Sequence, residues 1–163
     1  MAKPNKDKTN VMRVLDQQKV PYTAHTYPHE EGVPVDGVTS AARMGKDPAT
    51  VFKTLVTRGT SGACHVFVIP VHRELDLKAA ARACGEKSVA MIPVSDLLPL
   101  TGYVRGGCSP IGMKKPFDTT LDDSACVLDT VTVSAGKIGW QVELAPGDLA
   151  ALTGARFSPV TTE

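Results

Sequence analysis

The sequence predicts one mixed α/β (α+β) domain whose strands form a mixed sheet or a partly closed barrel. Three observations favour this fold. Strand-like runs come in pairs joined by turns, short helical segments lie between the pairs, and no linker or internal repeat divides the chain. At 163 residues, with 42% hydrophobic and 21% charged residues, the chain can build one sizeable core. Because hairpins dominate the pattern, a doubly wound parallel sheet is disfavoured.

Each element has a local sequence signal. Helices are expected where a capping residue precedes apolar residues that repeat at helical spacing. Strands are expected where β-branched and aromatic residues cluster between turns. Asp76 and Gly85 are placed to cap the two ends of an alanine-rich helix, and Thr9 or Asn10 is placed to cap the first helix. The expected helices are 11–18, 39–44, 77–84, 95–98 and 146–152, and the expected strands are 22–27, 51–56, 64–71, 89–92, 119–122, 126–134 and 140–144.

The composition excludes several classes of protein. A net charge of +1 and an aromatic content of 5% argue against a surface that grips nucleic acid through phosphates or stacked bases, so an RNA ligand would be held by a local patch or with a partner's help. The four cysteines form no CxxC pair, so a zinc ribbon is not expected and the thiols should be reduced. No secretory signal or transmembrane run is visible, so we expect a cytoplasmic protein without membrane contact.

Lys53 is a cation in the middle of the run Val51–Val56, which otherwise reads as a buried strand. Strand alternation places Lys53 with Leu55 on one face, and Phe52 with Thr54 on the other. An ammonium in this position must reach water or meet an anion in a cleft. The simpler interpretation is an edge-strand lysine that discourages aggregation.

The glycine-rich stretch 101–115 is the strongest local signal for a binding site. Glycines let a backbone approach a ligand and aim its amides at an anion, and Arg105, Lys114 and Lys115 could hold phosphates. The stretch is not a phosphate loop, because Met113 follows Gly112 where that motif requires lysine. By itself, this glycine-rich composition is also typical of a turn with a purely structural role.

Neither nucleophilic side chain in this stretch has a complete catalytic context. Ser109 lacks a GxSxG elbow and an evident histidine partner, so a triad serine is not expected. Cys108 has basic neighbours, and is either a reactive thiol or a small packing residue.

Two further segments carry side chains that could form a site. His25 and His29 have a spacing that suits metal only on a helix, which Pro28 opposes, so no metal site is expected. Tyr27 could offer its hydroxyl to a ligand or simply pack.

The segment 134–139 is a second glycine turn that carries a lysine, and alone it reads as a hairpin turn.

Taken together, several motifs resemble one family in their order along the chain. They are His25-Thr26-Tyr27, Val51-Phe52-Lys53-Thr54-Leu55, Leu75-Asp76-Leu77-Lys78, Thr101-Gly102-Tyr103, Gly106-Gly107-Cys108-Ser109-Pro110-Ile111-Gly112, Ser134-Ala135-Gly136-Lys137 and Glu143-Leu144-Ala145-Pro146-Gly147-Asp148-Leu149. The chain is similar to YbaK/EbsC proteins, free-standing relatives of the editing domain of bacterial prolyl-tRNA synthetase. The similarity runs from about Val11 to Phe157.

This resemblance implies a compact α/β domain on a mixed, barrel-like sheet surrounded by helices. The implied organisation is a disordered or loosely held N-terminus at 1–10, an editing domain at 11–157 and a C-terminal tail at 158–163. The implied activity is hydrolysis of mischarged Cys-tRNA(Pro) in trans, without cofactor or metal, with the acceptor end of the tRNA as ligand and prolyl-tRNA synthetase as partner. The family's essential lysine matches Lys53. Substrate binding is implied for Tyr27, for Gly106, Gly107, Cys108, Ser109, Pro110 and Gly112, and for Gly136, Lys137 and Gln141.

Gln141 departs from the family pattern, because close relatives carry an aspartate there. An amide can hydrogen-bond but cannot serve as a base or balance an ammonium, so the amino-acid preference stays open. The alternatives are a deacylase for Ala-tRNA(Pro) or another mischarged tRNA, and a non-catalytic module that binds aminoacyl-tRNA. The attacking group is either a bound water or the thiol of the substrate cysteine.

Overall fold

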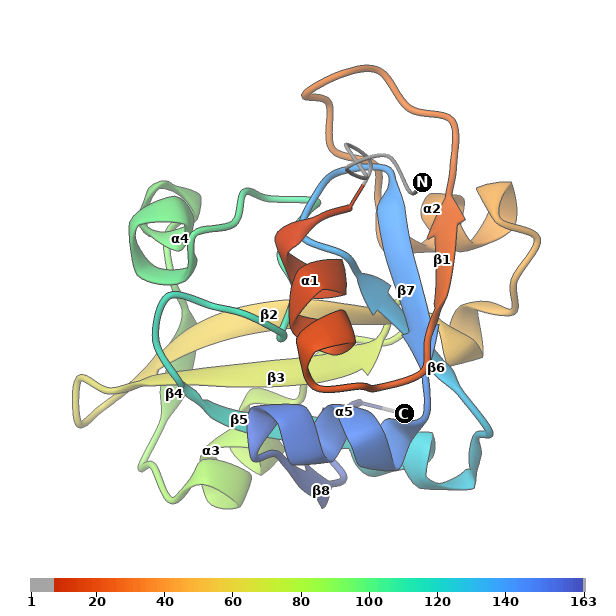
Figure 1. The fold of residues 1–163 in the computed structure, drawn as a ribbon. Coiled ribbons are helices and arrows are strands. Elements are labelled where there is room, and N and C mark those ends of the chain that lie inside the picture. Colours follow the sequence, from red (N-terminus) through yellow and green to blue (C-terminus); the bar gives the residue numbers. More distant parts are fainter. Residues whose placement is uncertain (1–7, 163) are drawn as a thin grey trace.

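Two sheets of unequal size form the framework of the computed structural model, which describes residues 8–162 (Figure 1). The larger sheet has five strands in the order β4-β2-β3-β5-β8, and the smaller has three in the order β1-β7-β6. The strands are β1 (Thr23–Thr26), β2 (Phe52–Gly59), β3 (Cys64–Pro70), β4 (Val89–Met91), β5 (Asp118–Asp122), β6 (Val131–Ser134), β7 (Trp140–Leu144) and β8 (Arg156–Ser158).

The larger sheet is mixed. The β2–β3 hairpin and the β2–β4 pair are antiparallel, whereas β3 pairs with β5 and β5 with β8 in parallel. In the smaller sheet both pairs are antiparallel. The predicted class, a single mixed α/β domain, is confirmed, but the strands do not close into a barrel: the two sheets meet at a bridge between Val51 and Thr132.

One edge of β2 is interrupted, and this interruption determines where the site lies. β3 covers one edge from Phe52 to Arg58, so β4 and β6 must both meet the other edge. β4 pairs with β2 only from Thr57 to Gly59, and β6 reaches it only at Val51. Between these two contacts the edge around Thr54 is covered by no strand in the described part of the chain.

The helices begin and end at residues that the sequence marks. They are α1 (Asn10–Gln17), α2 (Gly37–Arg43), α3 (Leu77–Cys84), α4 (Val94–Thr101) and α5 (Pro146–Thr153). Thr9 caps α1 by accepting a hydrogen bond from the Met12 amide, as predicted, and Asp76 and Gly85 cap α3, also as predicted. None of the helices in residues 8–162 has the length and hydropathy needed to cross a bilayer.

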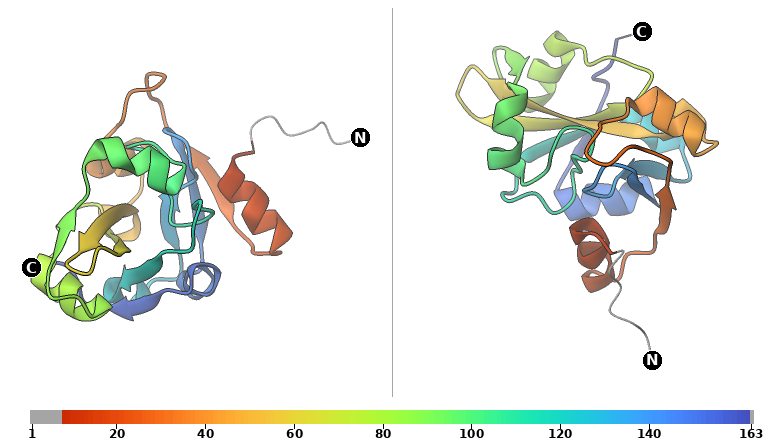
Figure 2. Two further views of the ribbon diagram at one scale, coloured as in Figure 1. Left: turned by 90° about the vertical axis from the view of Figure 1, so that its left-hand side faces the viewer. Right: turned by 90° about the horizontal axis from the view of Figure 1, so that it is seen from above.

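Two helices and one connection lie along β2. Seen from above in Figure 2, α2 (orange) and α4 (green) lie toward opposite ends of β2 (yellow), with the connection after β1 between them. The two larger apolar cores hold the sheets: the main one fills the space between β2, the smaller sheet, α1 and α5, and the second lies between β3 and α3. Strand alternation assigns Phe52 and Val56 to the main core and Leu55 to the second.

Three details differ from the sequence-based expectation. Residues 123–127 form a 3-10 helix that includes the first two residues of the expected strand 126–134, and Asp122 caps this helix through the Ser124 amide. The strand β8 was not predicted. Residues 158–162 contact the domain closely: Val160 is buried and its amide donates to Asp122. Residues 1–7 and Glu163, which complete the two predicted terminal segments, lie outside the described residues.

Candidate active site

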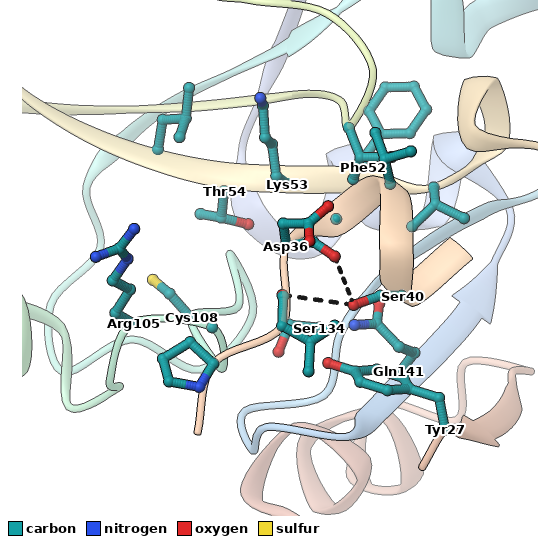
Figure 3. Close-up of a pocket in the computed structure, with 18 residues that line it drawn as sticks. Tyr27, Asp36, Ser40, Phe52, Lys53, Thr54, Arg105, Cys108, Ser134 and Gln141 are labelled. Carbon is teal, nitrogen blue, oxygen red and sulfur yellow. Dashed lines mark hydrogen bonds between the residues drawn. The ribbon is translucent and has the colours of Figure 1, made fainter. Parts of the chain in front are cut away.

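A cavity of about 620 Å³ opens at the uncovered edge of β2 (Figure 3). Four parts of the chain surround it: the end of β1, the connection into α2, the first half of β2 and the glycine-rich stretch, with one face of β6 and β7 as the floor. The lining residues are Tyr27, Pro34, Val35, Asp36, Gly37, Val38, Ser40, Val51, Phe52, Lys53, Thr54, Leu55, Val71, Arg105, Gly106, Cys108, Ser134 and Gln141.

Two buried oxygens in this lining have no protein partner. Thr54 Oγ1 and Gln141 Oε1 are both buried and neither forms a hydrogen bond within residues 8–162. Gln141 is only 6% exposed. A buried polar atom without a partner is costly, so such atoms in a cavity wall are available to accept a hydrogen bond from a ligand or from water.

The backbone of Thr54 faces the same opening. The Val56 carbonyl accepts from the Ile92 amide at 3.2 Å, where β4 approaches β2. Backbone groups of a strand point alternately to its two edges, so the N–H and C=O of Thr54 point to the same edge as the Val56 carbonyl. At Thr54 that edge is the cavity.

Lys53 lines the cavity from the other face of β2. Its side chain and that of Thr54 extend to opposite sides of the strand in Figure 3, as the alternation predicts. Partial burial lowers the pKa of the Lys53 ammonium below the usual 10.5, and the negative charge of Glu74 opposes this shift. No carboxylate of residues 8–162 lies within ion-pair distance of Lys53.

The glycine-rich stretch contributes Arg105, Gly106 and Cys108 to the cavity. Gly106 has a φ of +84°, and a Cβ there would lie 2.9 Å from Cβ of Pro34, so only glycine fits this turn against the opposite wall. Burial raises the pKa of the Cys108 thiol to about 12. This thiol is therefore protonated at neutral pH, which favours the packing interpretation over the reactive one.

The rest of the predicted loop packs against the protein instead of lining the cavity, with Gly112 at the solvent-exposed surface. Ser109 is fully buried and its hydroxyl accepts from the Ile111 amide at 3.2 Å. Gly112 approaches Asn10 and the hydroxyl of Tyr103. Pro110 and Gly107 are buried too, and none of these four residues lines the cavity.

The glycine turn at 134–139 packs against the glycine-rich stretch 101–115. A Cβ on Gly136 would lie 2.9 Å from the Tyr103 ring, and a Cβ on Gly107 would lie 3.0 Å from the Ile138 amide. The Lys137 side chain is exposed and does not line the cavity. Tyr27, Lys53, Gly106, Cys108 and Gln141 are thus the predicted site residues that the fold brings together.

The connection into α2 forms the wall opposite the glycine-rich stretch. Asp36 is the only carboxylate in the lining, and it caps α2 by accepting from the Thr39 amide at 3.0 Å. Hydrogen bonding to Thr39, first to its side chain and then to its amide, lowers the pKa of Asp36 below the usual 3.8. Ser40 Oγ donates to the Asp36 carbonyl at 3.0 Å, and Gly37 lies so close to Val71 that a Cβ would overlap its side chain.

A carboxylate network fixes the floor beside Gln141. Glu143 shares a face of β7 with Gln141 and accepts hydrogen bonds from His25, Lys46 and Thr130, at 2.8, 2.9 and 2.5 Å. These bonds, that of Thr130 first, lower the pKa of Glu143 to about 2. His25 and His29 do not share a site, since His29 contacts the Tyr27 carbonyl.

Comparison with known proteins identifies the family. The family model described as the aminoacyl-tRNA editing domain matches residues 34–152. The chain belongs to this family. A protein of Enterococcus faecalis (strain ATCC 700802 / V583), provisionally named the Cys-tRNA(Pro)/Cys-tRNA(Cys) deacylase EbsC, is 45% identical over 161 residues, covering 99% of this chain and 98% of EbsC. The sequence-based resemblance to YbaK/EbsC proteins is confirmed, and the enzyme class that it implied, an aminoacyl-tRNA deacylase, is consistent with this family.

Solved structures show the same fold at lower identity. A protein provisionally described as a trans-editing enzyme for prolyl tRNA synthetase has a TM-score of 0.79 and 22% identity, with full coverage of both chains. The hypothetical protein APE2540 has a TM-score of 0.82 and 22% identity, covering 93% of this chain and 99% of its own. At this identity the likeness concerns the fold alone.

The sequence alone does not identify Asp36, Ser40 or Ser134 as site residues. Only the fold brings the connection into α2 and the end of β6 to the cavity wall. Thr54 did leave a signal, as a polar residue on the apolar face that it shares with Phe52 and Val56.

Proposed function

We propose that this editing protein hydrolyses the ester of mischarged Cys-tRNA(Pro) in trans, with the aminoacyl end of the tRNA in the cavity at the edge of β2. The observation that supports this most is the pair of buried acceptors without protein partners, Thr54 Oγ1 and Gln141 Oε1. A cysteinyl ester brings two donor groups, its α-ammonium and its thiol. The substrate in the name of the similar protein EbsC agrees with this assignment.

The lining residues suit an aminoacyl group with a positive amine. Gln141 Oε1 accepts a hydrogen bond from the α-ammonium, and the Asp36 carboxylate balances its charge. Because its pKa is lowered, Asp36 stays ionised at neutral pH and is a weak base, which fits charge balance better than proton abstraction. Tyr27 closes the end of the pocket beside Gln141.

Two backbone amides are candidates for stabilising the oxyanion. Within the glycine-rich stretch, the Gly107 amide donates to the Val104 carbonyl and the Ile111 amide donates to Ser109. These two amides therefore already donate hydrogen bonds within the protein. We assign the developing oxyanion to the amides of Gly106 and Cys108, which line the cavity together with Arg105.

Lys53 supplies positive charge beside the ester or the terminal phosphate. The ester is already activated, so positioning and charge stabilisation account for most of the required rate. The attacking oxygen of water, or the sulfur of the substrate cysteine, bonds to the ester carbonyl carbon. The bond from that carbon to the ribose oxygen then breaks, and the ribose oxygen takes up a proton. Water attack gives free cysteine directly, whereas sulfur attack gives a thiolactone that water then opens.

Prolyl-tRNA synthetase is the proposed partner. With a net charge of +1, this chain has little general attraction for tRNA phosphates, so a synthetase that already holds the tRNA would present the acceptor end.

The test is deacylation of Cys-tRNA(Pro), Cys-tRNA(Cys) and Ala-tRNA(Pro) side by side, with and without prolyl-tRNA synthetase. We expect release of cysteine from Cys-tRNA(Pro) to be fastest and to increase with the synthetase. Preferential hydrolysis of Ala-tRNA(Pro) would contradict the substrate assignment, and binding of all three without cleavage would identify a non-catalytic module.

A further inference from the structure

A second, smaller cavity lies beside the first and has a different character. It has a volume of about 180 Å³ and is walled by apolar side chains of β4, α4 and the connection between them, chiefly Met91, Ile92, Pro93, Val94 and Leu97. The proposed function assigns it no role. Val94 is 60% exposed and Met91 is 49% exposed, so apolar surface at its rim is open to solvent.

The two cavities adjoin each other. Thr54, Leu55, Arg105, Gly106 and Cys108 line both of them. A ligand whose ester carbonyl lies at Gly106 in the larger cavity therefore places its next chemical group at the mouth of the smaller one. In an aminoacyl-tRNA that group is the terminal ribose with its base.

The chemistry of the smaller cavity fits a nucleoside. Its walls are apolar and carry a methionine, which suits the flat face of a base. Arg105 stands at the shared wall, is exposed, and has no ion-pair partner in residues 8–162. Its guanidinium can stack on a base or meet the adjoining phosphate. An apolar slot beside a free cation is complementary to a nucleotide, which has an apolar face and an anionic group.

We propose that the smaller cavity binds the 3′-terminal adenine of the aminoacyl-tRNA, while the larger cavity binds the aminoacyl group. This assignment rests on the proposed function. The site needs little base-specific hydrogen bonding, because every tRNA ends in the same adenosine.

The test places a charge at the rim without disturbing the core. Val94→Glu repels the phosphate and makes the slot polar, and Val127→Glu is the matched control, because Val127 is 87% exposed and lines neither cavity. For Cys-tRNA(Pro) we expect Val94→Glu to raise KM about tenfold with kcat unchanged, a size typical of one lost base contact. The control should match the wild type.

Adenosine 5′-monophosphate provides a readout that does not depend on catalysis. In methyl NMR spectra it should shift Ile92, Val94 and Leu97 in the wild type, and its affinity should fall about tenfold in Val94→Glu. If the wild type is inactive but these shifts occur, the proposed reaction fails and the nucleoside site stands. If the wild type is active but Val94→Glu keeps its KM and the nucleotide shifts no methyl group of α4 or β4, the nucleoside site is refuted. Loss of synthetase stimulation alone would instead make this slot a protein-docking surface and would also refute it.

Discussion

Lys53 and Thr54 are neighbours on β2 and extend to opposite faces of the strand, yet both line the same cavity (Figure 3). This is possible because the cavity lies at the uncovered edge of the strand, where side chains from both faces of β2 border the same space. A cation from one face and a hydroxyl from the other can therefore act on one ligand, which gives the cavity its two kinds of polar wall.

Replacing Gln141 should separate stability from function. Gln141→Leu removes a buried oxygen that has no protein partner, so we expect the free energy of unfolding to stay the same or rise by about 1 kcal/mol. The same change removes the proposed acceptor for the α-ammonium, so KM for Cys-tRNA(Pro) should rise about tenfold. Urea denaturation and steady-state deacylation measure the two effects. A stable variant with wild-type KM would remove Gln141 from substrate binding.

Asp36→Asn tests the carboxylate charge while the helix cap is retained. Asparagine caps helices about as well as aspartate, so stability should change by less than about 0.5 kcal/mol. Without the charge that balances the α-ammonium, we expect KM to rise several-fold with little change in kcat.

Asp47→Asn is the matched control for this change, because Asp47 caps the 3-10 helix at 48–50 through the Ala49 amide and lies outside the cavity. If both variants raise KM equally, the effect of Asp36 is not local to the cavity.

The Glu143 network predicts how stability depends on pH. The folded-state pKa of about 2 lies below the usual 4.5, so the stabilising contribution is fully present above about pH 4.5 and is lost as the pH falls through about 2. Glu143→Gln should therefore lower the free energy of unfolding at pH 7 and flatten its acid dependence between these limits. Chemical denaturation at a series of pH values measures this.

Glu31→Gln is the control for the acid dependence, because Glu31 is exposed. An acid dependence in Glu143→Gln as steep as that of the wild type would show that the network carries no such linkage.

The sequence predicts the local elements better than it predicts the site. Caps such as Asp76 and Gly85 act within a few residues, and the alternation around Lys53 follows from strand geometry alone. The parallel pairing of β5 with β3 and β8 joins distant segments, and no local pattern specifies it.

The glycine-rich stretch shows the limit most clearly. Its composition predicts a close backbone approach, but not which residues approach a ligand and which approach the core. Gly106 and Cys108 line the cavity, whereas Ser109 is buried in the protein interior and Gly112 lies exposed beside Asn10. That division depends on Tyr103 and on the turn at 135–139, whose positions only the fold defines.

The pH dependence of catalysis should reflect Lys53. Burial lowers the pKa of its ammonium below 10.5, so a reaction that needs the charged form should decline on the alkaline side at a lower pH than a free lysine would allow. Lys53→Arg should move this decline to higher pH if it retains activity, because a guanidinium stays charged.

Single-turnover deacylation of Cys-tRNA(Pro) by Lys53→Ala tests the central claim most directly, with Lys78→Ala, an exposed lysine on α3, as the control. We expect Lys53→Ala to lose about a hundredfold or more in rate while it keeps its fold, and the control to match the wild type. A Lys53→Ala rate near that of the wild type would contradict the claim that this cavity cleaves the ester with the help of Lys53.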